Sequence, residues 1–321
     1  MPRTVKAAVV NDFKVPPSYQ DIEIADPSEN QVQIKVLATG LHQLVKSRAS
    51  GAHYSANVKL PLIPGVDGVG ELPDGELKYF MTFNPTSTGS FAEYANVAKD
   101  DLLPVPKGAD PAIVGGLLNP AMSSWLALRN RVELKKGFTV LILGVTGGSG
   151  QLAVQIARLL GASRIVGTGR NQKALDSLLA NGLDAAITLS DDDTENEKAF
   201  AQEAANIDIV LDYLYGPVAE VAMRAIIGKR EVTSQRLDWI QIGSMAGQTI
   251  SLPANALRAA NFYISGSGLG SISMADFRTE LTELIKYLAS GKLTGAVDPK
   301  SLKDISTAWT ARSDGRQVFV L

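Results

Sequence analysis

The sequence predicts an α/β protein in which a β-rich part precedes a doubly wound parallel sheet. Up to Pro111, short apolar and β-branched runs are separated by proline and glycine, which is typical of strands and turns. From Thr139 onward, apolar strands alternate with helical stretches, as expected for a parallel sheet covered by helices on both faces. The length of 321 residues favours two domains.

The β-rich part is expected to contain strands at residues 5–10, 31–38 and 91–97. Residues 31–36 alternate polar and apolar side chains, which is the period of a half-buried strand. The end of the chain, residues 316–320, also has the composition of a strand, and we expect it to rejoin this part.

The second part is expected to alternate strands with helices. The predicted strands are residues 139–143, 164–168, 185–189, 208–214, 238–243 and 262–265. The predicted helices are residues 112–118, 123–131, 150–160, 172–180 and 274–290. The acidic run Asp191-Asp192-Asp193 is interpreted as the start of a helix rather than a metal site, because carboxylates satisfy free N–H groups there.

Composition excludes several classes of function. The net charge is −2, so no basic excess exists to neutralise phosphates, and no nucleic-acid partner is expected. The chain has no cysteine, which excludes disulfides, iron–sulfur clusters, cysteine nucleophiles and thiolate zinc sites. No apolar stretch reaches the roughly 18 residues of a membrane span. We therefore expect a soluble, cytoplasmic protein.

A glycine-rich turn between a strand and a helix carries the strongest chemical signal. Glycines at 144, 147 and 150 follow the predicted strand 139–143 and open the helix. Such a turn presents bare backbone N–H groups at a helix N-terminus, where a pyrophosphate binds. The sequence therefore predicts a dinucleotide site, with candidate cofactor-binding residues Gly144, Thr146, Gly147, Gly148, Ser149 and Gly150.

The next strand indicates which dinucleotide is bound. An NAD-selective enzyme usually places Asp or Glu after this strand to bind the ribose hydroxyls. This chain has Arg170 there, followed by Asn171 and Lys173. A guanidinium pairs well with a phosphate, so NADP(H) is favoured over NAD, although Arg170 stacking on adenine or facing solvent stays open.

The carboxyl ends of further parallel strands should line the rest of the site, because ligands bind at that edge of a doubly wound sheet. For each of these side chains, packing remains an alternative to direct contact. The candidates are Asp212, Tyr213, Ile242, Gly243, Ser244, Ser265 and Gly266.

Four further segments carry a family resemblance that covers nearly the whole chain. These are residues 60–70 (LPLIPGVDGVG), 89–94 (GSFAEY), 119–125 (NPAMSSW) and 143–155 (LGVTGGSGQLAVQ). In order and spacing they resemble the zinc-independent, quinone-oxidoreductase-like branch of the medium-chain dehydrogenase/reductase family. The resemblance implies a GroES-like catalytic domain over residues 1–118, completed by 290–321, and a Rossmann dinucleotide-binding domain over 119–289.

The resemblance also implies the chemistry. Zinc-dependent members carry Gly-His-Glu where this chain has Gly65-Val66-Asp67, so we expect no metal. Without a Lewis acid, hydride transfer from NADPH to a quinone or an α,β-unsaturated carbonyl is the accessible reaction. His42 stands where the family often has Asn, and His42 and Tyr54 are the candidate catalytic residues, with packing as the alternative. Ser123 is expected to support the nicotinamide.

Two other functions remain open at this level. An enoyl-thioester reductase would need a basic rim for phosphopantetheine, which Arg129, Arg131, Lys135 and Lys136 could form. A non-catalytic NADPH-binding protein is the other alternative. The expected partners are a small-molecule substrate and, by resemblance, a second copy of the chain paired through residues 262–268, because an exposed apolar edge strand favours association.

Overall fold

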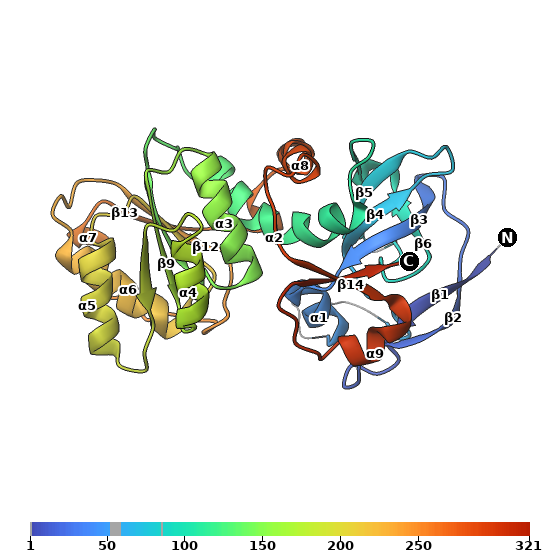
Figure 1. Ribbon diagram of the computed structural model, residues 1–321, viewed down its shortest axis with the longest axis horizontal. Helices are drawn as coiled ribbons and strands as arrows, with labels where there is room; N and C mark the ends of the chain where they lie inside the picture. Colours follow the sequence, from blue (N-terminus) through green and yellow to red (C-terminus); the bar gives the residue numbers. More distant parts are fainter. Residues whose placement is uncertain (1, 52–58, 85) are drawn as a thin grey trace. The chain divides into compact units, whose positions relative to one another are not determined.

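The computed structural model describes residues 2–51, 59–84 and 86–321. The chain divides into two compact units, each with its own sheet (Figure 1). The first unit comprises Met1–Pro120 and Leu281–Leu321, and the second comprises Ala121–Glu280. The C-terminal segment therefore returns to the N-terminal part of the chain.

The first unit is built on a seven-stranded sheet and a separate two-stranded one. The order in the large sheet is β14-β15-β3-β4-β5-β7, with β6 also paired to β3, while β1 pairs with β2. The strands are β1 (Arg3–Val9), β2 (Ser18–Ile24), β3 (Gln31–Gly40), β4 (Asp67–Glu71), β5 (Leu77–Met81), β6 (Tyr94–Ala98), β7 (Leu102–Pro104), β14 (Val297–Ser301) and β15 (Arg316–Val320).

Strand β3 is half buried in the way its alternation predicts. Ile34 and Val36 are buried, whereas Lys35 between them is exposed. Ile34 and Val36 pack with Phe80 of β5 in one apolar cluster. The C-terminal strand β15 pairs antiparallel with β3, which confirms that the end of the chain rejoins this unit.

The second unit contains a six-stranded, all-parallel sheet of order β10-β9-β8-β11-β12-β13. The chain runs outward from β8 to β10 and then returns to β11, so the order reverses between β8 and β11. This is the doubly wound arrangement that the sequence predicted. The strands are β8 (Thr139–Leu143), β9 (Arg164–Gly169), β10 (Ala185–Thr188), β11 (Ile209–Asp212), β12 (Leu237–Gln241) and β13 (Phe262–Gly266).

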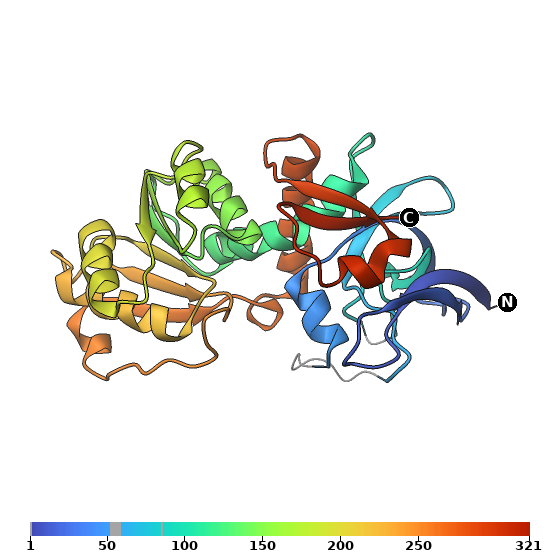
Figure 2. The ribbon, with the colours of Figure 1, turned by 60° about the horizontal axis from the view of Figure 1, so that its bottom comes forward.

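Helices cover both faces of this sheet. Helices α3 (Gly148–Leu159) and α4 (Gln172–Leu179) lie on one face, and α5 (Asp193–Ala204) and α6 (Gly216–Lys229) lie on the other (Figures 1 and 2). Asp192 caps α5 by accepting hydrogen bonds from the backbone of Thr194 and Glu195, so the acidic run begins a helix as expected. The short helix α7 (Ala256–Ala259) precedes β13.

One expectation about the helices was wrong. The sequence suggested two helical stretches separated near Pro120, but α2 (Pro111–Asn130) is a single helix with Pro120 inside it. The remaining helices are α1 (Gln43–Ala49), α8 (Met274–Ala289) and α9 (Ile305–Ala308). None of the helices in the described part of the chain is long and apolar enough to cross a bilayer.

Candidate active site

The glycine-rich turn has the strand–turn–helix geometry that the sequence predicts. Strand β8 ends at Leu143, and Gly144 adopts a φ of +90°, a conformation that favours glycine. Gly147 precedes the first residue of α3, and no side chain caps this end of the helix. The first N–H groups of α3 therefore lack a side-chain acceptor from the described residues and are suited to bind an anion.

The glycines of this turn meet different surroundings. A Cβ on Gly150 would lie 2.5 Å from the carbonyl oxygen of Gly144 and 2.6 Å from the Cα of Val145, so only glycine fits there. At Gly147 the nearest atom to such a Cβ is 3.6 Å away. Gly147 is exposed, whereas Gly150 is buried. An exposed glycine at the helix N-terminus lets the backbone approach a bound pyrophosphate closely.

The residues that follow β9 have two different roles: two are exposed cations, and one caps the next helix. Arg170 and Lys173 are exposed. Asn171 instead caps α4, because its side-chain oxygen accepts a hydrogen bond from the backbone N–H of Ala174 at 3.1 Å. The local fold thus uses Asn171 to start the helix and leaves the two cations available for a phosphate.

The carboxylate of Asp212, at the end of β11, accepts its hydrogen bonds from groups of the protein itself. Its carboxylate is fully buried and accepts hydrogen bonds from the backbone of Leu214 and Tyr215 and from Trp239 Nε1, at 2.7–2.9 Å. Burial raises the pKa of Asp212, which these hydrogen bonds partly offset. Tyr215 has a φ of +55°, so the carboxylate holds a strained turn in place.

Other strand ends lie together at this edge of the sheet. The backbone N–H groups of Ile242 and Gly243 both donate to the carbonyl of Asp212. Ser244 follows them. In the next strand, Ser265 and Gly266 pair with the last residues of β12. The structure therefore brings the predicted cofactor residues of β11, β12 and β13 to one edge.

Tyr213 and Ser123 are joined directly. The Tyr213 hydroxyl lies 2.9 Å from Ser123 Oγ, and burial raises the pKa of Tyr213 to about 12. This contact links the strand-end residues to α2.

Tyr213→Phe should change how stability depends on alkaline pH. The folded pKa of Tyr213 lies above its unfolded value near 10, so its stabilising effect is complete below about pH 10 and is lost as pH rises through 12. The effect is up to about 3 kcal/mol. At neutral pH the variant should lose about 1 kcal/mol with the hydrogen bond to Ser123. Between neutral and alkaline pH, the free energy of unfolding should fall less in the variant than in the wild type, as measured by chemical unfolding. Tyr19→Phe is the control.

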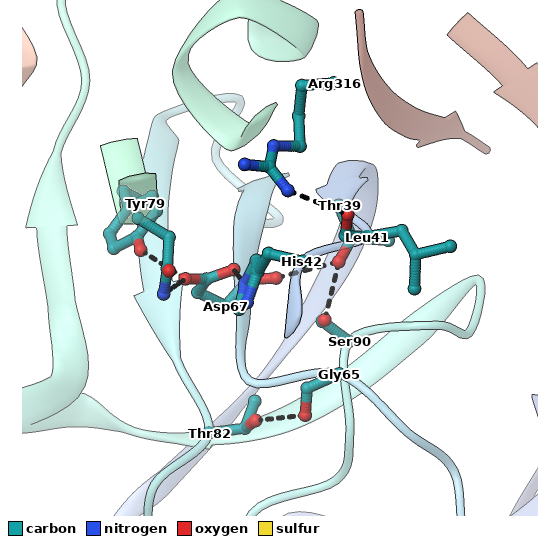
Figure 3. Close-up of polar contacts among 10 residues, drawn as sticks. Thr39, Leu41, His42, Gly65, Asp67, Tyr79, Thr82, Ser90 and Arg316 are labelled. Atoms are coloured by element: carbon teal, nitrogen blue, oxygen red, sulfur yellow. Dashed lines mark hydrogen bonds and ion pairs between the residues drawn. The ribbon is translucent and has the colours of Figure 1, made fainter. Parts of the chain in front are cut away.

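In the first unit, His42 lies in a buried polar cluster. His42 precedes α1 and is 5% exposed. Its Nε2 lies 3.3 Å from Asp67 Oδ1, and Asp67 is completely buried at the start of β4. Figure 3 shows the side chains of His42 and Tyr79 converging on Asp67. The sequence predicted His42 as a site residue but did not predict its carboxylate partner.

The second oxygen of Asp67 accepts two further hydrogen bonds. Tyr79 Oη and Asn119 Nδ2 both donate to Asp67 Oδ2 at 2.8 Å. Burial, and then the negative charge of Asp67, raise the pKa of Tyr79 well above its usual value, so the phenol keeps its proton. Thr39 Oγ1 fixes the backbone by donating to the carbonyl of Asp67 at 2.8 Å.

A small polar pocket of about 140 Å³ borders this cluster. His42 lines it together with Gln43, Lys46, Ser313 and Arg316. Arg316 donates to the carbonyl of Leu41 at 3.2 Å (Figure 3). Burial lowers the pKa of both Lys46 and Arg316. The pocket therefore combines two partly desolvated cations with an imidazole.

The other catalytic candidate, Tyr54, lies outside the described residues. Asp67, Tyr79, Asn119 and Arg316 were missed as site residues. The available signal was Asp67, a carboxylate within the otherwise apolar and glycine-rich residues 62–70, since an unpaired charge is rarely buried.

Comparisons with known proteins agree with this architecture. The chain is 32% identical over 347 residues to a protein of Emericella nidulans described as a probable NADPH-dependent quinone reductase, covering 94% of this chain and 96% of that protein. It is 26% identical to the chloroplastic NADPH-dependent alkenal/one oxidoreductase of Arabidopsis thaliana, covering 94% of this chain and 73% of that protein. A search of protein-family models found no match.

Solved structures share the fold. The quinone oxidoreductase of Thermus thermophilus superposes with a TM-score of 0.78 at 24% identity, covering 98% of this chain and all of that chain. The quinone oxidoreductase of Pseudomonas syringae gives a TM-score of 0.79 at 21% identity, with both chains fully covered. Together with the full-length relative at 32% identity, the two-unit fold and the glycine turn show that this chain belongs to the zinc-independent, quinone-oxidoreductase-like branch of the medium-chain dehydrogenase/reductase family.

Proposed function

We propose that the protein is an NADPH-dependent, zinc-free reductase that transfers a hydride to a quinone or an α,β-unsaturated carbonyl. The observation that carries this proposal is the uncapped N-terminus of α3 behind the glycine turn, with Arg170 following the adjacent strand. The names of the relatives from Emericella and Arabidopsis support both the cofactor and the two substrate classes.

The residues present suit NADPH. The backbone N–H groups at the start of α3 would bind its pyrophosphate, and Arg170 and Lys173 would bind its 2′-phosphate. Ser123 and Tyr213 would support the nicotinamide end, while Asp212 positions the turn that follows β11. When bound, the cofactor supplies the hydride.

The reduced product must then gain a proton. Hydride addition to a quinone or an enone leaves negative charge on oxygen, which hydrogen bonds or proton transfer must neutralise. His42 is the titratable group of the described cluster that has a ring nitrogen without a protein partner. We assign it the proton-donating role, and Tyr54 stays a second candidate.

The test is a turnover assay with purified protein. NADPH oxidation is followed by absorbance against a benzoquinone, a naphthoquinone, an enone and crotonyl-CoA, and each reaction is repeated with NADH. Rapid oxidation of NADPH with a quinone or an enone supports the proposal. Turnover of crotonyl-CoA alone would instead assign an enoyl-thioester reductase, and NADPH binding without any turnover would favour a non-catalytic role.

The contacts of Arg129 and Arg131 count against the thioester alternative. Arg129 of the expected basic rim pairs with Glu280 at 3.0 Å, and Arg131 donates to the carbonyl of Ser271 at 3.1 Å. These two guanidinium groups already have partners within the second unit. A phosphopantetheine chain would have to compete with them.

We also expect a homodimer formed through β13. This strand pairs with β12 on one side and ends the sheet, and Tyr263 and Ile264 on it are 47% and 36% exposed. Ser267 N donates to the carbonyl of Gln241, so by strand alternation the N–H of Ile264 points away from β12. That N–H is available for pairing with a second copy.

Ile264→Pro should convert the dimer to a monomer, because proline removes the outward N–H while leaving the bonds to β12 intact. Ile264→Ala keeps the N–H and should stay dimeric. Sedimentation velocity measures both. A monomeric wild type, or a proline variant that stays dimeric with unchanged affinity, would rule out this interface.

A further inference from the structure

The two ring nitrogens of His42 have different surroundings. Nε2 lies 3.3 Å from Asp67 Oδ1, whereas Nδ1 is buried and has no hydrogen-bond partner among the described residues. His42 also lines the pocket that contains Lys46 and Arg316. Buried polar nitrogens normally have partners, so an unpartnered Nδ1 on a residue that lines a pocket indicates a place for a ligand atom.

The hydrogen-bond donors around Asp67 determine which nitrogen carries the hydrogen. The phenol of Tyr79 and the amide of Asn119 both donate to Oδ2, so that oxygen carries no proton. An ionised carboxylate only accepts hydrogen bonds. Its remaining contact, from Oδ1 to His42, is then satisfied when Nε2 is the donor.

We propose that Asp67 is a positioning residue that holds His42 in its Nε2–H form and thereby presents Nδ1 to the substrate oxygen. This inference rests on the proposed reductase function. In the imidazolium form, the Nδ1–H bond breaks as the O–H bond of the hydroquinone or enol forms. The hydride supplies the electron pair for the new bond on the other reactant atom, and neutral His42 keeps its hydrogen on Nε2.

Groups of both charge signs surround His42. Asp67 contacts its Nε2, and Lys46 and Arg316 line the same pocket. The same two cations favour negative charge on a substrate oxygen in the pocket. Tyr79 stays neutral and adds no charge. The cluster therefore suits a group that donates a proton to an oxyanion and returns to the neutral state.

Asp67→Asn is the decisive substitution. The amide oxygen would accept the hydrogen bonds from Tyr79 and Asn119, which leaves the amide NH₂ facing His42 Nε2. Two donors cannot share that contact, so the ring should move its hydrogen to Nδ1. The substitution is nearly isosteric and reverses the tautomer.

Nitrogen-15 NMR reads the tautomer without any need for activity. The chain has two histidines, so long-range ¹H–¹⁵N spectra contain two ring patterns, and His53→Gln assigns them. We expect neutral His42 to carry its hydrogen on Nε2 in the wild type and on Nδ1 in Asp67→Asn. A wild-type Nδ1–H form, or no change in the variant, overturns the inference.

Steady-state kinetics gives the second readout. In Asp67→Asn, kcat should fall by about 10²- to 10⁴-fold, the range for losing a general acid or its correct tautomer, while NADPH affinity stays near that of the wild type. Thr82→Val is the matched control, because it removes a neighbouring, partly buried hydrogen bond to the carbonyl of Gly65 without touching Asp67. An equal loss of kcat in both variants would make the effect structural and refute the inference.

The reductase function and the positioning role of Asp67 can fail separately. If no quinone or enone is reduced by the wild type, the proposed function fails, and the NMR spectra still decide whether Asp67 sets the tautomer. If the wild type is active and Asp67→Asn keeps its kcat, the positioning role is wrong while the reductase function stands.

Discussion

Gly150→Ala is expected to raise the Kd for NADPH by about 100-fold or more and to lower the melting temperature of the ligand-free protein. The added Cβ would lie 2.5 Å from the Gly144 carbonyl oxygen and 2.6 Å from the Val145 Cα. Both atoms belong to the backbone, so the strain cannot be relieved by a side-chain rotation. Overpacking of this kind costs about 1–3 kcal/mol or more, and a shift of the α3 N-terminus displaces the donors that bind the pyrophosphate.

Gly147→Ala separates packing from binding. Its Cβ would have no neighbour closer than 3.6 Å, and its φ of −77° suits alanine, so the ligand-free variant should melt within a few degrees of the wild type. Any loss of NADPH affinity would then report contact between this position and the cofactor. Calorimetric melting and fluorescence titration with NADPH measure the two effects.

Measurements on Gly150→Ala and Gly147→Ala can contradict the proposed cofactor site. If Gly150→Ala binds NADPH as tightly as the wild type, the turn is not the pyrophosphate site, and the cofactor assignment of residues 144–150 fails. If both variants lose stability alike, the distinction between the two glycines is wrong. Retained stability at Gly147 with lost affinity is the result that best supports the proposed site.

The parallel sheet was predictable from sequence because its signals are local. Each strand of the second unit is a short apolar run, and the turn between β8 and α3 consists of a few consecutive residues with a recognisable glycine pattern. All six predicted strands are present, and they form one parallel sheet. Strand β4 was not predicted, because glycine and acidic residues are depleted in strands. A Cβ at Gly70 would lie 2.5 Å from the carbonyl of Lys35, so this composition allows the close approach of β3.

The histidine cluster was only partly predictable because its contacts are distant in sequence. Asp67 meets His42 across 25 residues and Asn119 across 52. Arg316 reaches Leu41 across 275 residues, through the pairing of β15 with β3. No periodicity or motif in a single sequence encodes such pairings. Likewise, the sequence proposed Asn171 and Asp212 as cofactor residues but did not predict that their side chains cap a helix and hold a turn.

Arg170→Gln is expected to raise the KM for NADPH by about 10- to 100-fold while changing the KM for NADH by less than about threefold. A hydrogen bond to a charged group is worth about 1.5–3 kcal/mol, and the guanidinium pairs with a phosphate in a bidentate manner. NADH is a built-in control, since it differs from NADPH only in the 2′-phosphate. Steady-state kinetics with both cofactors and one quinone measures the effect.

The position of Arg170 explains why this contrast is expected. A Cβ on Gly169 would lie 3.1 Å from Thr146 Oγ1, so the end of β9 passes directly against the glycine-rich turn. On its other side, Asn171 fixes the start of α4 through its hydrogen bond to Ala174. Arg170 is therefore held between two constrained residues with its side chain exposed. If Arg170→Gln weakened NADPH and NADH equally, the guanidinium would stack on the adenine they share, and selectivity would have to come from Lys173 or another group.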